Sequence, residues 1–265
     1  MIEQVIEPQG KYLYGIVRSS SGERNFDGVA AIGNPGGSVH TVCQNGLAMV
    51  VSDATAAEYP TTRTNLLAHE RVQERVLQEC TVLPVRFGTV AAGEEPAAAG
   101  NIRKLLEKRS PEFQRLLADM EGSVELGVKA LWRDERGVFE EIVARRSDIR
   151  RLRDRLRDRP LAATYFDRAR LGEMVKDALG QTKRVEATAI LAPLRRLARR
   201  VVENDVVVDR MVVNAAFLVE GARQHDFDDA VAKLDAELGH RIQLKYVGAV
   251  PPYNFVNITV NWKEL

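Results

Sequence analysis

A long stretch without glycine or proline constrains the fold of this chain more than any other feature. Neither residue occurs between Gly137 and Pro160. Apolar residues recur there at the a and d positions of a heptad, with Arg145 interrupting one of them: Val138, Ile142, Ile149, Leu152 and Leu156. A second helical pattern runs from about residue 167 to 202, and Pro193 should kink or restart it. Together the two patterns predict a long helical hairpin over about residues 135–202.

Strand patterns lie on both sides of this hairpin. "SVELGVKALW" (123–132) precedes it and "DRMVVNAAFLVE" (209–220) follows it. A helix is expected over residues 226–239, and "RIQLKYVGAV" (241–250) alternates as a further strand. The first part of the chain adds a strand over 12–17, a β-hairpin turning at Asn45-Gly46, a helix over 65–79 capped by Thr62 or Thr64, and helices over 101–108 and 111–120.

This mixture of strands and helices predicts an α+β fold. Because 265 residues exceed the usual size of one domain, we expect an N-terminal domain over 1–121 and a C-terminal domain over 122–250. Pro251-Pro252 then breaks the chain and begins a tail over 251–265. The tail alternates apolar and polar residues from 253 to 262. Its apolar side needs a buried site, so we expect it to complete a sheet within this chain rather than offer its edge to a partner.

Charge and composition argue against several classes of function. The net charge of +1 comes from 38 basic and 37 acidic residues, so nothing draws the whole chain towards nucleic acid or anionic membranes. The two cysteines, Cys43 and Cys80, do not form a disulfide framework. Neither a signal peptide nor an apolar run long enough to span a bilayer is visible. We therefore expect a cytoplasmic protein without membrane or nucleic-acid partners.

No sequence motif indicates catalysis or cofactor binding. "GNPGGS" (33–38) lacks the lysine and the strand-to-helix context of a phosphate-binding loop. The histidines fall on four separate elements: His40, His69, His225 and His240. Neither GxSxG nor HExxH occurs. An enzyme hypothesis therefore has no candidate catalytic residue in this sequence, and we expect no cofactor and no metal.

The run "TVLPVRFGTV" (81–90) places an arginine in an apolar strand pattern. At period two, Leu83, Val85 and Phe87 share one face, and Arg86 lies on the other. A lone arginine without a glycine-rich cradle is weak evidence for an anion site. We expect Arg86 to form a structural ion pair with a carboxylate of the preceding helix: Glu70, Glu74 or Glu79.

The hairpin carries the densest charge of the chain. Residues 145–159 hold eight arginines and three aspartates but no aromatic residue. RNA binding would need aromatic stacking partners, for which Tyr12, Tyr14 and Tyr246 are the candidates, but no RNP-like string is present. A solvated helical hairpin is the favoured interpretation, with Arg151, Arg155 and Arg157 open for contact with another protein.

Five strings in order resemble the GvpF/GvpL family of gas vesicle proteins, over nearly the whole chain: "YLYGIV", "VLPVRFGTV", "ELGVKA", "NAAFLV" and "PPYNFV". The resemblance implies two α+β domains, the second a modified ferredoxin-like domain that here carries the inserted hairpin. It also implies a C-terminal tail that docks back on the N-terminal domain. One departure is Leu126, where the family has a tryptophan before "GVKA".

The resemblance implies a minor gas vesicle component required for vesicle assembly, which is not an enzyme and has no catalytic residues. Its expected partners are the small, very hydrophobic major shell protein GvpA, whose aggregation it would prevent during nucleation, and other accessory proteins of the vesicle. Candidate contact residues are Arg151, Arg155 and Arg157 of the hairpin, and Tyr253, Phe255 and Trp262 of the tail. The alternative function is an RNA-binding or regulatory module on a ferredoxin-like sheet.

Overall fold

The chain divides into two compact units in the computed structural model, which describes residues 10–19 and 22–262. Unit 1 comprises Met1–Glu125 together with Ala249–Leu265, and unit 2 comprises Leu126–Gly248. Both combine helices and strands, so the predicted mixture of the two is confirmed.

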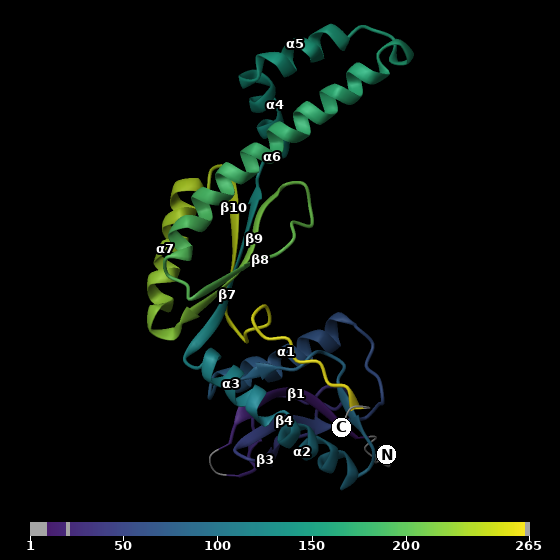
Figure 1. The fold of residues 1–265 in the computed structure, drawn as a ribbon, viewed down its shortest axis with the longest axis vertical. Coiled ribbons are helices and arrows are strands. Elements are labelled where there is room, and N and C mark those ends of the chain that lie inside the picture. Colours follow the sequence, from purple (N-terminus) through teal and green to yellow (C-terminus); the bar gives the residue numbers. More distant parts are fainter. Residues whose placement is uncertain (1–9, 20–21, 263–265) are drawn as a thin grey trace. The chain divides into compact units, whose positions relative to one another are not determined.

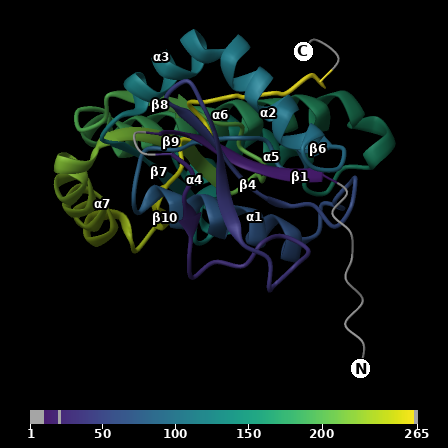
Figure 2. The same cartoon turned by 90° about the horizontal axis from the view of Figure 1, so that it is seen from below.

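Unit 1 is built on a sheet with the strand order β2-β3-β4-β1-β5, and β6 pairs with β1 beside β5. Its elements are β1 (Gly10–Arg18), β2 (Asn25–Phe26), β3 (Val39–Gln44), β4 (Leu47–Asp53), α1 (Arg63–Leu77), β5 (Leu83–Pro84), β6 (Val90–Ala92), α2 (Ala97–Lys108) and α3 (Ser110–Met120). Helix α1 covers one face of the sheet, while α2 and α3 cover the other (Figures 1 and 2). The core on the α1 side contains Tyr12 and Tyr14 of β1 packed with Val72 and Val76 of α1.

Local sequence explains two of these elements. Asn45 and Gly46 have φ angles of 51° and 73°, the conformation that a type I′ turn requires, and they join β3 to β4 as predicted. Thr62 begins α1 by accepting a hydrogen bond from the Asn65 N–H at 3.2 Å, which satisfies one of the free donors of the first turn.

Unit 2 contains a four-stranded sheet of order β10-β7-β9-β8. Its elements are β7 (Ser123–Trp132, which begins in unit 1), α4 (Glu135–Arg145), α5 (Ser147–Leu156), the 3₁₀ turn η1 (Leu161–Ala163), α6 (Tyr165–Arg195), β8 (Arg200–Glu203), β9 (Met211–Glu220), the 3₁₀ turn η2 (Gly221–Arg223), α7 (Gln224–Leu238) and β10 (Ile242–Val250). Helices α6 and α7 pack on the sheet, where the Phe217 and Phe227 rings lie 5.1 Å apart. The hairpin of α4, α5 and α6 extends away from this sheet (Figure 1).

The hairpin differs from the sequence prediction at three points. Its first arm is two helices, because Arg146 adopts an extended conformation and its guanidinium pairs with Asp148 in the first turn of α5. Pro193 does not restart the second arm, since α6 continues through it and ends two residues later. Val201 and Val202 do not extend the helix but lie in β8, where they pair with β9.

Two segments that the sequence predicts as strands differ from the prediction. Of the run 81–90, β5 takes only Leu83 and Pro84, and both side chains are buried. Over the described part of the tail, residues 251–262, no strand forms: turns occupy 253–255, and Ile258 forms an isolated parallel bridge with Val85. A single bridge forms instead of a ladder because the prolines and the turn bring only this part of the tail alongside residue 85.

Candidate functional site

The tail lies on unit 1 through contacts with buried groups. The Tyr253 hydroxyl donates to Gln73 Oε1 at 2.8 Å, and Gln73 Nε2 donates to the Tyr14 carbonyl at 2.6 Å. Val256 and Ile258 are 6% and 1% exposed, whereas the residues between and after them face outward. The alternation of apolar and polar residues therefore predicts which side chains of the tail are buried, although the tail does not form a strand there.

A buried carboxylate holds the turn of the tail. Glu125 is 4% exposed and accepts hydrogen bonds from the Asn254 backbone N–H at 2.7 Å and from Asn254 Nδ2 at 2.6 Å. Burial raises the pKa of Glu125, and the two donors act in the opposite direction. Further along, Arg109 Nη1 donates to the Thr259 carbonyl at 2.8 Å.

An open cavity of about 300 Å³ lies between the tail and α1, and we call it the tail groove. Its lining is Leu66, His69, Glu70, Pro84, Val85, Arg86, Phe87, Tyr253, Val256, Asn257 and Ile258. Apolar side chains form most of this surface, and one acid and one arginine lie among them. Partial burial, and then the charge of Glu74, raises the pKa of Glu70. The groove can take apolar side chains and orient them by a polar group at either side.

Beneath the groove lies a closed aromatic cluster. The Tyr12 hydroxyl is 3.0 Å from His69 Nδ1 and accepts the Gly88 N–H at 3.0 Å. His69 stacks on the Tyr14 ring at a centroid distance of 5.7 Å, and Phe87 meets it edge-on. Burial lowers the pKa of His69 to about 4 and raises the pKa of Tyr12, so both groups are neutral at pH 7. The cluster is a rigid floor for the groove and not a proton-transfer site.

Acidification should destabilise unit 1 through His69. The pKa of His69 is 6.5 in an unfolded chain and about 4 when folded. Between these two pH values the imidazole is therefore mostly protonated in the unfolded chain and mostly neutral in the folded chain. The free energy of unfolding is unaffected by this group above pH 6.5, and it decreases as the pH falls towards 4, by about 3 kcal/mol. Urea unfolding between neutral pH and about pH 5 measures it. His69→Gln should show a flatter pH dependence than the natural chain; an equal slope would contradict this assignment.

The structure places Arg86 differently from the prediction. Its side chain is exposed and lies at the tail groove, and within the described residues it forms no ion pair with Glu70, Glu74 or Glu79. The ion-pair prediction is wrong because β5 ends at Pro84, so the chain turns Arg86 outward instead of across the sheet.

The other predicted contact residues fall into two groups. Arg151, Arg155 and Arg157 are exposed on the hairpin, although Arg151 donates to the Ser147 carbonyl and Arg157 to Asp154. Of the tail residues, Tyr253 lines the groove and is 37% exposed. Phe255 is buried at 8% exposure and Trp262 is half-buried. The tail groove thus brings together Arg86 and Tyr253 but not the other two aromatic residues.

Sequence reasoning missed Gln73, His69 and Glu125 as supports of this site. His69 and Gln73 follow Leu66 at helical spacings, which is a signal for one buried face of α1. Glu125 gives no comparable signal, because its partner lies 129 residues away.

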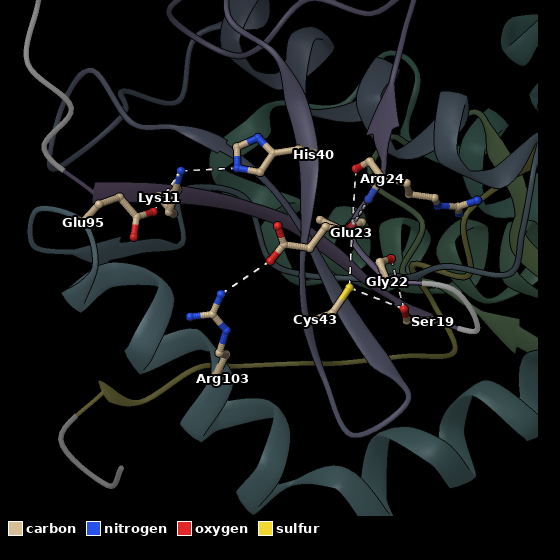
Figure 3. Close-up of polar contacts among 10 residues, drawn as sticks. Lys11, Ser19, Gly22, Glu23, Arg24, His40, Cys43, Glu95 and Arg103 are labelled. Carbon is tan, nitrogen blue, oxygen red and sulfur yellow. Dashed lines mark hydrogen bonds and ion pairs between the residues drawn. The ribbon is translucent and has the colours of Figure 1, made fainter.

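A second polar cluster lies around β1, β3 and α2 (Figure 3). Lys11 Nζ is 2.7 Å from Asp53, 3.0 Å from Glu95 and 3.3 Å from His40 Nε2. Burial acts to lower the pKa of Lys11, but the two carboxylates outweigh it and raise the pKa. Burial, and then the charge of Lys11, lowers the pKa of His40. These groups satisfy one another, so the tail groove is the stronger candidate site.

The residues proposed for RNA stacking are not available for it. Tyr12 and Tyr14 are fully buried, and the Tyr246 hydroxyl donates to Asp228 at 2.5 Å while its ring stacks on Phe227. Within residues 10–19 and 22–262, no group of three or more His, Cys, Asp or Glu side chains is placed to hold a metal ion. None of the helices in those ranges has both the length and the apolar character needed to cross a membrane.

Comparison with known proteins gives consistent matches over almost the full chain. The model of the family described as gas vesicle synthesis protein GvpL/GvpF matches residues 10–257. Gas vesicle protein F of Streptomyces sp. (strain CB03234) is 31% identical over 245 residues, which cover 92% of this chain and 98% of that protein. Gas vesicle protein F of Nostoc sp. (strain PCC 7120) is 26% identical over 252 residues, covering 94% and 99%.

The fold matches solved structures as well. The crystal structure of GvpF from Anabaena sp. PCC7120 aligns with a TM-score of 0.81 at 25% identity, covering 95% of this chain and 100% of that one. GvpF from Microcystis aeruginosa aligns with a TM-score of 0.76 at 25% identity, covering 93% and 98%. The chain belongs to the GvpL/GvpF family of gas vesicle synthesis proteins.

Proposed function

We propose that this chain is an accessory protein of gas vesicle assembly that binds the major shell protein GvpA and prevents its aggregation during nucleation. Family membership supports the role in vesicle synthesis. The observation that carries the binding step is the tail groove, an open and largely apolar cavity on unit 1. In this role the protein binds other gas vesicle proteins without catalysing a reaction, and it is located at the gas vesicle.

The groove fits a short part of a hydrophobic subunit. A cavity of about 300 Å³ holds one or two apolar side chains, which is enough for an anchor at the centre of an interface. Glu70 and Arg86 then contact polar groups of the bound segment and set its direction. Covering apolar side chains of a shell subunit in this way would keep those surfaces from associating with one another before assembly.

We also propose that unit 2 is a modified ferredoxin-like domain with an inserted helical hairpin. Its strand order, β10-β7-β9-β8, corresponds to 4-1-3-2 in chain order, with helices after the first and third strands. This is the β-α-β-β-α-β arrangement of ferredoxin-like domains. The hydrogen bonds of Tyr253 and Asn254 support the tail, 251–265, as a segment docked on the N-terminal domain.

Reversing the charge at the groove should weaken shell-protein binding. Arg86→Glu places an acid beside Glu70, and we expect roughly 5- to 30-fold weaker binding, as for the loss of 1–2 kcal/mol. Pull-down of GvpA with the tagged chain at several concentrations measures this. Arg115→Glu, an exposed reversal on α3, is the matched control and should bind as the natural chain does. If Arg86→Glu bound GvpA as tightly as Arg115→Glu does, the tail groove would not be part of the interface.

The hairpin arginines are a second proposed contact, for other accessory proteins of the vesicle. The triple variant Arg151→Glu, Arg155→Glu and Arg157→Glu should keep GvpA binding and lose capture of the accessory partners, because the reversal acts on unit 2 alone. Unchanged capture would eliminate these arginines as a contact.

A further inference from the structure

Unit 2 exposes two separate apolar groups whose surroundings carry opposite charge. The first is at the end of the hairpin, where α5 turns into α6 (Figure 1). Leu161, Tyr165 and Phe166 are 71%, 70% and 85% exposed, and the Tyr165 and Phe166 rings touch at a centroid distance of 5.6 Å. We call these three residues the apolar tip. Three large side chains so exposed within six residues of sequence, two of them with their rings in contact, are unusual on a protein surface that has no partner.

The apolar tip lies in the most basic part of the chain. Residues 150–170 contain eight arginines and three aspartates, an excess of five positive charges. The whole chain has a net charge of +1, so the remaining residues together carry −4. Arg159 and Arg170, which flank the tip in sequence, are both exposed. The tip therefore fits an apolar surface with acidic residues around it.

The second apolar group lies in the connection between two strands of the unit 2 sheet. Val206, Val207 and Val208 are 50%, 74% and 45% exposed, and Asp205 and Asp209 flank them. We call residues 205–209 the valine loop; it connects β8 to β9.

The valine loop is held in place at both ends. Asn214 Nδ2 donates to the Asp205 carbonyl at 2.8 Å, and the Met211 N–H donates to the Val208 carbonyl at 2.9 Å. An ordered loop that presents three valines to solvent has a defined apolar surface.

We propose that the apolar tip of one copy of this chain binds the valine loop of a second copy. Both groups are exposed, so they do not bury each other within one chain. Helix α6 carries the tip away from the sheet over its 31 residues, whereas the connection from β8 to β9 lies beside the sheet, away from the end of the hairpin (Figure 1). Arginines around the tip and aspartates beside the valines make the contact complementary in charge as well as in polarity.

This contact joins two different surfaces, so each bound copy leaves one tip and one loop free. Such head-to-tail association continues to longer chains unless it closes into a ring. The interface is small, so the association is weak and depends on concentration. Because part of the attraction is between exposed charges, salt weakens it. None of this depends on binding to the shell protein.

Two variants test the proposal by complementation. The tip variant is Tyr165→Ser with Phe166→Ser, and the loop variant is Val207→Ser with Val208→Ser. All four side chains are exposed, so both variants keep the fold. Sedimentation velocity of the natural chain should show dimers and longer species that increase with concentration. Each variant alone should be monomeric, and an equimolar mixture should form a 1:1 dimer that grows no further, because only one intact tip can meet one intact loop.

Three results would overturn the proposal. The natural chain could remain monomeric at all concentrations and at low salt. Either variant alone could associate as the natural chain does, which would indicate loop-to-loop contact if it is the tip variant and tip-to-tip contact if it is the loop variant. Finally, the natural chain could remain monomeric in solution and bind vesicles of anionic phospholipid through the tip, which would assign the patch to a membrane surface.

Discussion

Replacing Trp132 by alanine is expected to lower the free energy of unfolding of unit 2 by about 3–5 kcal/mol, the largest effect of any single change considered. Trp132 is 1% exposed at the end of β7, and its Nε1 donates to Glu186 on α6. Lys183 lies over the ring at 5.4 Å. Alanine leaves a cavity between the sheet and the helix that carries the hairpin, and urea unfolding followed by helical circular dichroism measures the loss.

Trp132→Phe separates packing from hydrogen bonding at this position. It keeps most of the buried area and loses only the N–H donor, so we expect a cost of about 1–2 kcal/mol. Glu186 still pairs with Arg241 Nε at 2.7 Å, which limits the penalty. If Trp132→Ala and Trp132→Phe were equally stable, the ring would not be a packing element of the α6–sheet contact.

The second large effect is expected at the tail. Ile258→Asp places a charge at a site that is 1% exposed and paired with Val85, so the tail should leave unit 1. The cost is at most the free energy with which the tail docks, because a released tail loses nothing further. Burial of one isoleucine contributes about 1.5–3 kcal/mol, which corresponds to a tenfold or greater rise in the released population. Chymotrypsin cleavage after Tyr253 or Phe255 reports that population.

Thr259→Asp provides the matched control for the tail variant. It introduces the same charge one residue further along, on the exposed side, and leaves the carbonyl that Arg109 contacts unchanged. Its cleavage rate should equal that of the natural chain. Equally fast cleavage of the natural chain, the control and Ile258→Asp would show that the tail is not docked in solution.

Elements with local causes could be predicted from the sequence. The turn at Asn45-Gly46 depends on two residues that tolerate positive φ, and the start of α1 depends on the hydroxyl of Thr62. The charged hairpin was recognisable from the absence of glycine and proline over 138–159. In each case the residues that allow the prediction belong to the predicted element or lie next to it in the sequence.

Elements that depend on distant partners could not be predicted in the same way. Val201 and Val202 suit a helix or a strand, and pairing with β9 selects the strand. The break at Arg146 follows from its pairing with Asp148 and from the packing of α4 and α5 on α6, not from a helix-breaking residue. In the tail, apolar alternation indicated burial correctly but not the absence of a ladder.

The candidate site shows the same limit. Tyr253 was a candidate from its aromatic ring, but its partner Gln73 lies 180 residues earlier in the chain. Arg86 was expected to be paired because its neighbours are apolar, whereas the end of β5 at Pro84 leaves it at the rim of the groove. Neither relation is visible before the fold brings α1, the residues after β5 and the tail together.

The most direct measurement for the central claim is the solubility of GvpA when it is co-expressed with this chain. After sedimentation, the amount of GvpA in the supernatant is compared between cells with the natural chain, with Arg86→Glu and with no accessory chain. We predict that GvpA stays in solution and co-purifies with the natural chain, less with Arg86→Glu, and that it pellets when expressed alone. If GvpA pellets equally in all three and none of it co-purifies, the proposal that this protein binds the shell subunit and prevents its aggregation is contradicted.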